Sequence, residues 1–250
     1  RVWSSSAEAG TTLAFSWAKQ ACATLELVAT LKDFISRIFG AGSTSTPASE
    51  SANAMPTFPA GVTPWLVIGL GNPGAEYEAT PHNVGYMAID ALLVRTGSHL
   101  APLKGLHAHA AATELAGKPV LLVRSTTFMN ESGIAVKDIA EHYSISLDQV
   151  IVVHDELDLP LGKVRVKQGG NENGHNGLKS TTEYMGSRDY VRVRMGISRP
   201  PQGVTVIDHV LGPIEAGPEL DSMIDVAADA VTEIVNNGLA AAQQKIHSRK

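Results

Sequence analysis

The chain has 250 residues, of which 44% are hydrophobic, so it can bury the core of one ordinary domain with room for an extension. Its formal net charge of −5 gives no long-range attraction to a polyanion, so any nucleic-acid partner must meet a local basic surface. The single cysteine, Cys22, excludes an intramolecular disulfide and a zinc site of clustered cysteines, and no apolar run approaches the ~20 residues of a membrane-spanning helix.

Residues 1–54 form an N-terminal extension by composition. Residues 40–54 are rich in Ser, Ala and Thr, which predicts a disordered low-complexity linker. Apolar residues at helical spacing between Leu25 and Ile38 predict a short helix before it. A targeting segment, which would make the protein organellar, stays open, although transit peptides are poorer in acidic residues than this stretch. We expect Met55 to be the native start.

From Trp65 onward, short apolar runs alternate with helical patterns, as is typical of an α/β sheet covered by helices on both faces. The predicted strands are 65–70, 108–115, 119–124, 150–154, 163–167 and 190–198. The predicted helices are 82–96, 132–143, 177–185 and 218–237. The two strands around residues 116–118 have a hairpin pattern. We therefore predict a single domain, residues 63–250, with a twisted mixed β-sheet.

The first motif with chemical content is Gly69-Leu70-Gly71-Asn72-Pro73-Gly74, directly after the first predicted strand. Its letters match a dinucleotide fingerprint, and Asp90 lies near the distance expected of a ribose contact. However, Pro73 and residues 76–79 separate the third glycine from any helix, and Asp90 falls within a helical pattern. The better interpretation is a loop that approaches a substrate closely, where the Asn72 amide can bind a peptide or an acyl oxygen.

The stretch Thr80-Pro81-His82-Asn83 has the form of a helix start, with Thr80 as the N-cap and Pro81 at the first helical position. His82 then lies in the first turn, where the positive end of the helix dipole disfavours the imidazolium form. A neutral histidine there can act as a general base near neutral pH, although a histidine at such a position often only completes a helix turn.

Asn130 lies in Phe128-Met129-Asn130-Glu131, where a predicted strand ends and a helix begins. Its amide could bind substrate or simply cap the helix. The loop Gly169 to Leu178 enters another helix, whose free backbone N–H groups can bind an anion. Both segments are therefore candidates for substrate contact.

The predicted strand 150–153 runs into His154-Asp155-Glu156-Leu157-Asp158. Ligands bind at such carboxyl ends of strands in open α/β sheets. A divalent metal held by His154, Asp155 and Asp158 is one interpretation. The spacing matches no specific metal motif, and one carboxylate suffices to orient a catalytic histidine, so we predict no metal.

The local charge around the glycine-rich loop is positive, unlike that of the whole chain. Between residues 163 and 199 there are eight basic residues and only three acidic ones, Glu172, Glu183 and Asp189. The basic residues are Lys163, Arg165, Lys167, Lys179, Arg188, Arg192, Arg194 and Arg199. This bias predicts contact with a phosphate backbone, with a solvated charged face as the alternative.

The motifs GLGNPGAEY, TPHNVG, TTFMNESG, HDELDLPLGK and GHNGLKS occur in this order and closely resemble the bacterial peptidyl-tRNA hydrolase family. The resemblance covers nearly all of residues 65–246. It implies hydrolysis of the ester bond between a peptide and tRNA, which releases tRNA for reuse in translation, with no metal or organic cofactor. We expect a monomeric, cytoplasmic enzyme that binds the acceptor end of peptidyl-tRNA and no membrane.

The resemblance also assigns roles to residues. It implies that His82 is the catalytic base, that Asp155 orients it, and that three asparagines, Asn72, Asn130 and Asn176, bind the peptide and the acyl carbonyl. It places the substrate's 3′ end at Tyr77 and Phe128, and a mobile lid at residues 208–213. The residues expected to bind substrate or tRNA further include His175, Lys163, Arg165, Lys167, Lys179 and Arg194.

Two departures from the family pattern stand out. Asn173 occupies a position where many relatives have glycine, which could alter the mobility of the loop, and the N-terminal extension has no counterpart in the family core. The alternative function is a non-hydrolytic RNA-binding relative, which would be expected to lose site residues that this chain retains. A nicotinamide or flavin enzyme is a third alternative.

Overall fold

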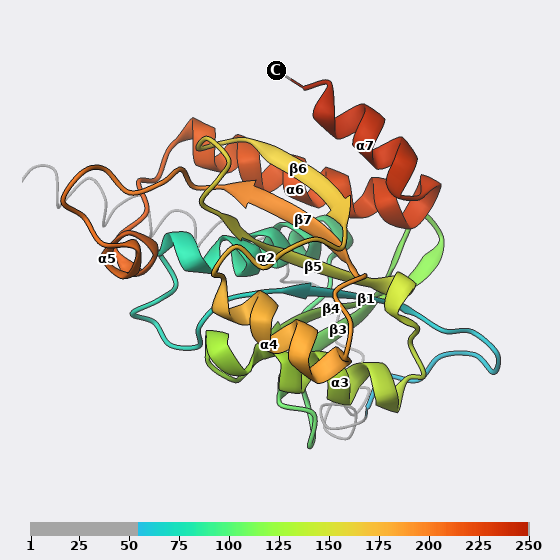
Figure 1. Ribbon diagram of the computed structural model, residues 1–250. Helices are drawn as coiled ribbons and strands as arrows, with labels where there is room; N and C mark the ends of the chain where they lie inside the picture. Colours follow the sequence, from blue (N-terminus) through green and yellow to red (C-terminus); the bar gives the residue numbers. More distant parts are fainter. Residues whose placement is uncertain (1–54, 250) are drawn as a thin grey trace, which may run out of the picture. The chain divides into compact units, whose positions relative to one another are not determined.

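The structure, a computed structural model, describes residues 55–249, which lie in one unit, Ser49–Lys250 (Figure 1). The linker and the short helix predicted within residues 1–54 lie outside the described residues. Within residues 55–249, no helix is long and apolar enough to cross a membrane.

Seven strands form one mixed sheet in the order β2-β3-β4-β1-β5-β7-β6. Their bounds are β1 Trp65–Gly69, β2 Ala101–Leu103, β3 Ala108–Leu115, β4 Lys118–Ser125, β5 Val150–Glu156, β6 Val164–Gln168 and β7 Val191–Gly196. The central strands β4, β1, β5 and β7 run parallel, whereas β2, β3 and β6 pair with their neighbours in antiparallel fashion. The predicted hairpin is confirmed, and both residues of its turn, Ala116 and Gly117, have positive φ angles, as its twist requires.

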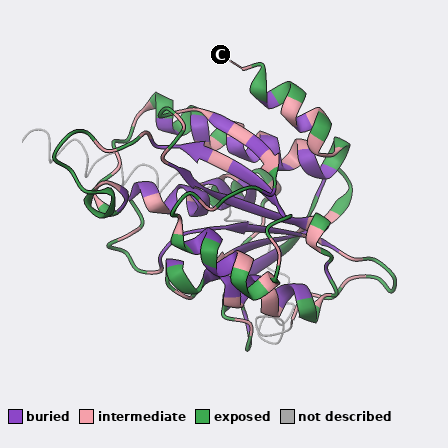
Figure 2. Ribbon diagram, viewed as in Figure 1, coloured by how far each residue is buried: buried purple, intermediate pink, exposed green. Residues whose placement is uncertain are grey.

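Helices cover both faces of the sheet, as predicted. Their bounds are α2 Val84–Thr96, α3 Ser132–His142, α4 Asn176–Met185, α5 Val206–Leu211, α6 Pro218–Asn237 and α7 Leu239–His247, with 3-10 turns η2 Pro81–Asn83, η3 Met129–Glu131 and η4 Leu147–Gln149. Helices α2, α6 and α7 share one hydrophobic core with the sheet, and α3 and α4 share another (Figure 1). Figure 2 shows the strands buried between these layers. The α/β fold class is therefore confirmed.

Three observed elements are absent from the sequence prediction: β2, α5 and α7. β2 has three residues and α5 has six, too few to establish a periodic pattern. α7 begins directly after Gly238, whose φ of 84° ends α6. A second helix so close to the first is hard to separate from it by periodicity alone.

Helix α7 covers β6, the edge strand of the sheet. The Val166 N–H donates to Nε2 of His247 at 3.1 Å, and Nε2 of Gln243 donates to the Val166 carbonyl oxygen at 3.3 Å. Ala242 and Ile246 of the same helix are buried in the core. These contacts satisfy backbone groups that an edge strand otherwise leaves open.

The backbone of α2 packs directly against the ends of β1 and β5 through Gly85. A Cβ added at Gly85 would lie 2.5 Å from the carbonyl oxygens of Leu70 and Val153, and one added at Gly69 would overlap the Gly85 carbonyl. Only glycine permits this approach. Because η2 immediately precedes α2, the contact holds η2 beside the carboxyl end of β5.

We expect Gly85→Ala to lower the free energy of unfolding by about 2–3 kcal/mol, because the added methyl group must push α2 away from two strand ends. Urea denaturation of the purified variants measures this. Gly217→Ala is the matched control, since its backbone is extended and an added Cβ meets nothing within 4 Å. Equal stability of the two variants would contradict the close contact.

Candidate active site

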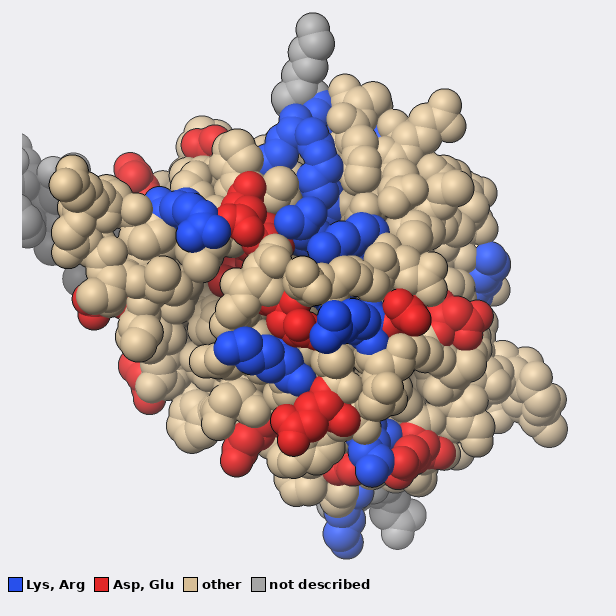
Figure 3. Space-filling view, viewed as in Figure 1, with Lys and Arg blue, Asp and Glu red and all other residues tan. Residues whose placement is uncertain are grey.

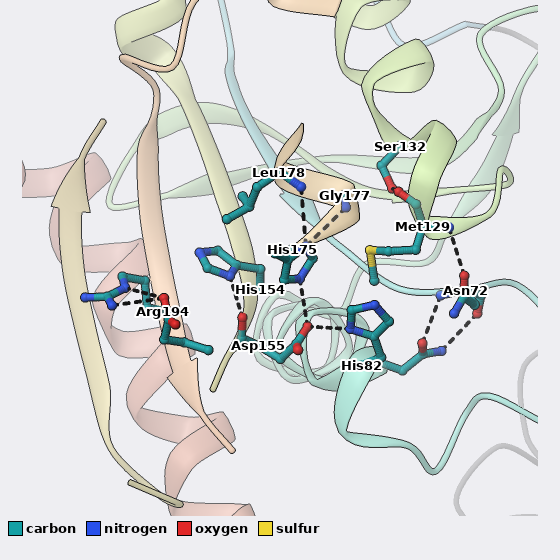
Figure 4. Close-up of polar contacts among 12 residues, drawn as sticks. Asn72, His82, Met129, Ser132, His154, Asp155, His175, Gly177, Leu178 and Arg194 are labelled. Carbon is teal, nitrogen blue, oxygen red and sulfur yellow. Dashed lines mark hydrogen bonds and ion pairs between the residues drawn. The ribbon is translucent and has the colours of Figure 1, made fainter. Parts of the chain in front are cut away.

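His82 and Asp155 are 73 residues apart in the chain, yet Nδ1 of His82 lies 2.9 Å from Oδ1 of Asp155 (Figure 4). His82 lies in η2 and Asp155 at the carboxyl end of β5. The packing of α2 on β1 and β5 explains how the two segments meet. The structure therefore brings together the two side chains that the predicted mechanism requires.

A second imidazole binds the same carboxylate oxygen. Nε2 of His175 lies 2.9 Å from Oδ1 of Asp155. Nδ1 of His175 accepts the N–H groups of Gly177 and Leu178, at 3.1 and 3.3 Å, so its proton is on Nε2. His175 thereby caps the start of α4. The resemblance placed His175 among the substrate-binding residues. Its role as an N-cap was not predicted, because histidine is not a preferred N-cap residue.

The carboxyl group of Asp155 is buried, with 3% of the residue exposed. Burial by itself raises the pKa of a carboxyl group, but attraction and hydrogen bonds from His175 and His82 outweigh it and hold the pKa of Asp155 well below its usual range. Asp155 is therefore ionised at neutral pH and accepts a hydrogen bond from an N–H group of each imidazole. With Nδ1 of His82 donating to Asp155, Nε2 of His82 is the nitrogen left to accept a proton.

His154 is buried on the opposite face of β5 from Asp155. Its Nδ1 donates to the Asp155 carbonyl oxygen at 2.6 Å, and its buried Nε2 has no hydrogen-bond partner among the described residues. Burial, and then the neighbouring His175, lower the pKa of His154 well below its usual range. His154 is therefore neutral in the folded protein near neutral pH.

One group of residues in the described part has the composition of a metal site: His82, Asp155 and His175, with ligand atoms within 4.8 Å of one another. It differs from the metal interpretation of the sequence, because His154 binds a backbone carbonyl and Asp158 pairs with Arg199. Nε2 of His175 carries a proton while Nδ1 accepts backbone N–H groups, so it has no lone pair for a metal. These contacts therefore fit hydrogen bonds from two imidazoles to Asp155 better than they fit a metal site.

Asn72 is held rigidly beside η2. Its backbone N–H donates to Oδ1 of Asn83 at 2.8 Å, and Nδ2 of Asn83 donates back to the Asn72 carbonyl oxygen at 2.9 Å. Oδ1 of Asn72 accepts the Met129 N–H at 2.8 Å, while no described residue accepts from its Nδ2 (Figure 4). The amide nitrogen is thus available to a substrate oxygen. Asn83 was not predicted as a site residue from the sequence, although it directly follows His82.

Four other predicted substrate residues lie on the segments next to this site. Asn130 is in η3 and Asn176 begins α4, and these two elements are in contact; both side chains are exposed. The rings of Tyr77 and Phe128 meet edge to face, with 6.4 Å between centroids, and Phe128 is 53% exposed. The structure thus brings each pair together, and their roles stay predictions.

A cavity of about 310 Å³ opens beside His82, Asp155 and His175. The glycine-rich loop forms one wall, and α5 forms another. Asn173 lines this cavity with a φ of 49°, a left-handed conformation that asparagine tolerates better than most residues. The departure from glycine is therefore compatible with the loop's backbone.

Arg192 does not belong to a phosphate-binding surface, and its inclusion in the basic stretch was wrong in that respect. Its side chain is fully buried and donates to the carbonyl oxygens of Asn171 and Gly170, both at 2.9 Å. Its guanidinium also lies 4.7 Å from the centre of the Tyr190 ring. The glycine-rich loop covers the part of the β7 face on which Arg192 lies. Arg192 therefore supports the loop that carries His175.

The other basic residues divide into paired and unpaired groups. Arg188, Arg194 and Arg199 form ion pairs with Glu172, Glu156 and Asp158, respectively. Lys163 donates to the Arg249 carbonyl oxygen. Within residues 55–249, no ion pair involves Arg165, Lys167 or Lys179, and β-sheet register places Arg165 opposite Arg194. Figure 3 shows Lys and Arg side chains gathered on this face.

The contacts correct one local interpretation of the sequence, the Thr80 cap, and agree with another, the helical position of Asp90. Thr80 precedes η2, but its hydroxyl donates to the Tyr77 carbonyl oxygen at 2.8 Å and caps no N–H group. Asp90, the ribose candidate of the dinucleotide alternative, lies within α2 and pairs with Arg124. Its place on a helix removes the geometry that a ribose contact requires.

Comparison with known proteins establishes the family to which the chain belongs. The sequence model of the family described as peptidyl-tRNA hydrolase matches residues 66–250. The chain belongs to the peptidyl-tRNA hydrolase family. It is 55% identical over 185 residues to peptidyl-tRNA hydrolase 2 of Corynebacterium glutamicum, an alignment that covers 74% of this chain and 88% of that protein. The resemblance seen in the motifs is therefore confirmed.

Another member of the family and a solved structure of a family member are also similar to this chain. The peptidyl-tRNA hydrolase of Frankia casuarinae is 45% identical over 192 residues, covering 76% of this chain and 97% of that protein. The crystal structure of peptidyl-tRNA hydrolase from Acinetobacter baumannii superimposes with a TM-score of 0.68 at 32% identity, covering 75% of this chain and 96% of that one. The fold is thus the fold of the family.

We expect the protein to lose stability as the pH falls from about 7 to about 5, in part through His154. The unfolded chain binds a proton on this residue below about pH 6.5, whereas the lowered pKa keeps it neutral when folded, so stability declines by up to about 1.4 kcal/mol per pH unit. His154→Asn retains a donor for the Asp155 carbonyl and should show a shallower decline in urea titrations. An unchanged slope would contradict the buried neutral state.

Proposed function

We propose that the chain hydrolyses the ester bond between a peptide and the 3′ end of tRNA, with His82 as the general base. The observation that carries this proposal is the bond from Nδ1 of His82 to buried Asp155, which leaves Nε2 as a proton acceptor beside a cavity. Family membership supports the substrate class, since the relatives compared above are named peptidyl-tRNA hydrolases.

In the proposed reaction, Nε2 of His82 removes a proton from a water molecule while the water oxygen attacks the ester carbonyl carbon. The tetrahedral intermediate carries a negative charge on the former carbonyl oxygen. Nδ2 of Asn72, from which no described residue accepts, would donate to that oxygen, with Asn130 as a second donor. Each such donor contributes about 3 kcal/mol in other acyl-transfer enzymes.

Collapse of the intermediate breaks the bond to the ribose oxygen of the tRNA. The proton held by His82 passes to this leaving oxygen, which gives tRNA with a free hydroxyl group. The peptide leaves as a carboxylic acid, which retains the second proton of the attacking water and releases it to solvent to become a carboxylate. Asp155 keeps His82 in the required tautomer and stabilises its imidazolium form during the step. No covalent acyl-enzyme is needed.

Asn176, together with Asn130, would bind the peptide, and Tyr77 and Phe128 would contact the 3′ end of the tRNA. The acceptor end would lie along the unpaired cations Arg165, Lys167 and Lys179, with Lys163 and Arg194 beside them. We propose a monomer that acts in the cytoplasm, where released peptidyl-tRNA would be its substrate. The single cysteine fits that reducing compartment.

Replacing the proposed base tests the chemistry. We expect His82→Ala to lower kcat for N-acetyl-aminoacyl-tRNA by about 10²–10⁴-fold with little change in KM, because general-base catalysis is lost while binding groups remain. Release of free tRNA from a labelled ester measures both constants. His107→Ala is the matched control, since His107 forms an exposed pair with Asp138 away from the cavity.

Full turnover by His82→Ala would rule out His82 as the base. If the unaltered chain bound the ester tightly and released no tRNA, the protein would instead be a non-hydrolytic RNA-binding member of the family. The same assay therefore separates the two functions.

The unpaired cations predict a salt effect that is specific to tRNA esters. We expect KM for N-acetyl-aminoacyl-tRNA to rise with NaCl concentration, and KM for an N-acetyl-aminoacyl ester of a small alcohol to change little. Arg165→Ala should reduce the slope of log KM against log salt by about 1. Lys137→Ala, which removes a cation of α3 outside the basic stretch, should keep the slope. Identical salt responses of the two esters would contradict phosphate contact.

A further inference from the structure

Helix α5 presents apolar side chains to the reaction cavity. Val206, Ile207 and Val210 line this cavity together with His82 and Asp155. Ile207 is 68% exposed and Val206 45%, which is unusual for large apolar residues beside a polar site. These exposed side chains are therefore available to a bound molecule.

The side chain of His209 hydrogen-bonds the middle of α5 to the two residues that follow Gly196, the last residue of β7. Its Nε2 lies 3.1 Å from the carbonyl oxygen of Ile197 and 3.1 Å from that of Ser198. Both oxygens are acceptors only, so Nε2 of His209 carries the proton and donates to both. The segment that contains α5 is tied at a second point, where the Ile214 N–H donates to the Ala79 carbonyl oxygen at 2.9 Å.

The acceptors of His209 are themselves fixed to the end of β5. The Ile197 N–H donates to the Glu156 carbonyl oxygen, and the Ser198 N–H donates to that of Leu159. Ser198 has a φ of 59°, a left-handed conformation uncommon for serine. The bonds of His209 thus connect α5 to the strand that carries Asp155, and they set the distance between the apolar wall and the catalytic pair.

We propose that His209 is a positioning residue, which holds α5 so that Val206 and Ile207 form a subsite for an apolar side chain on the amino acid esterified to the tRNA. This inference rests on the proposed hydrolase function. That amino acid carries the reacting carbonyl, and its side chain is attached to the carbon next to it, so the side chain would enter the cavity beside His82. A cavity of about 310 Å³ lies at the lower end of the range for small-molecule sites, about 300–1,000 Å³.

Charge argues for the peptide part of the substrate in this cavity and against the RNA part. Its lining includes the carboxylates of Asp155, Glu156 and Glu172, against one guanidinium, that of Arg199. Glu156 and Glu172 are paired with Arg194 and Arg188, but among the described residues Asp155 is paired only with imidazoles, and no lysine lines the cavity, so it offers little attraction to a phosphate backbone. A neutral apolar side chain gains from contact with Val206 and Ile207.

The test compares hydrolysis of N-acetyl-leucyl and N-acetyl-glycyl esters of the same tRNA, as the ratio of their kcat/KM values. We expect Ile207→Ser to lower the leucyl-to-glycyl ratio by about fivefold, because one lost apolar contact changes selectivity by about that factor. His209→Leu should lower the ratio similarly, since it removes the donor. His209→Gln should restore most of it, because the amide nitrogen of glutamine can donate to the same carbonyl oxygens.

Val94→Ser is the matched control, since Val94 is 83% exposed on α2 and does not line the cavity. An unchanged ratio in Ile207→Ser, or equal ratios in His209→Leu and His209→Gln, would overturn this inference alone. Failure of the unaltered protein to hydrolyse either ester would instead overturn the hydrolase proposal, and the inference with it. Faster hydrogen exchange of the 206–211 amides in His209→Leu than in His209→Gln would support the positioning role independently.

Discussion

The candidate site depends on one buried carboxylate that accepts hydrogen bonds from two imidazole N–H groups at a single oxygen. Asp155 is removed from solvent, so it needs partners, and His82 and His175 supply them from segments that are distant in sequence. The tautomers of both rings follow from these bonds. His175 is fixed as a donor by the backbone of α4, and His82 has one nitrogen directed to Asp155 and one left for chemistry.

The sequence predicted the parts of the site that lie at the ends of clear elements. Asp155 follows a buried apolar run, and His82 follows a loop and a proline, so both positions could be inferred from pattern and from family motifs. The contact of His175 with Asp155 and the support of Asn72 by Asn83 could not, because each depends on the distance between two segments. The pattern of residue types along the chain gives no information on the distance between two segments that are far apart in sequence.

The basic stretch also shows that contacts between distant segments could not be predicted from the sequence. Arg192 and Arg194 alternate with valines in β7, a pattern typical of a strand with one exposed face. In the structure the glycine-rich loop covers Arg192, and only tertiary packing decides which of two equivalent positions is covered. The fold class, the hairpin and the long helices were predictable because each rests on many residues. Helix α5, with six residues, was not.

The contact between α7 and β6 covers a strand edge at which another chain could otherwise add a strand. Gln243 and His247 occupy backbone groups of Val166 that another chain's strand would otherwise reach. Proteolytic loss of this last helix would uncover a ready template for strand addition and would also expose apolar surface around Ile246. Helix α7 therefore blocks strand addition at this edge of the sheet, an effect separate from catalysis.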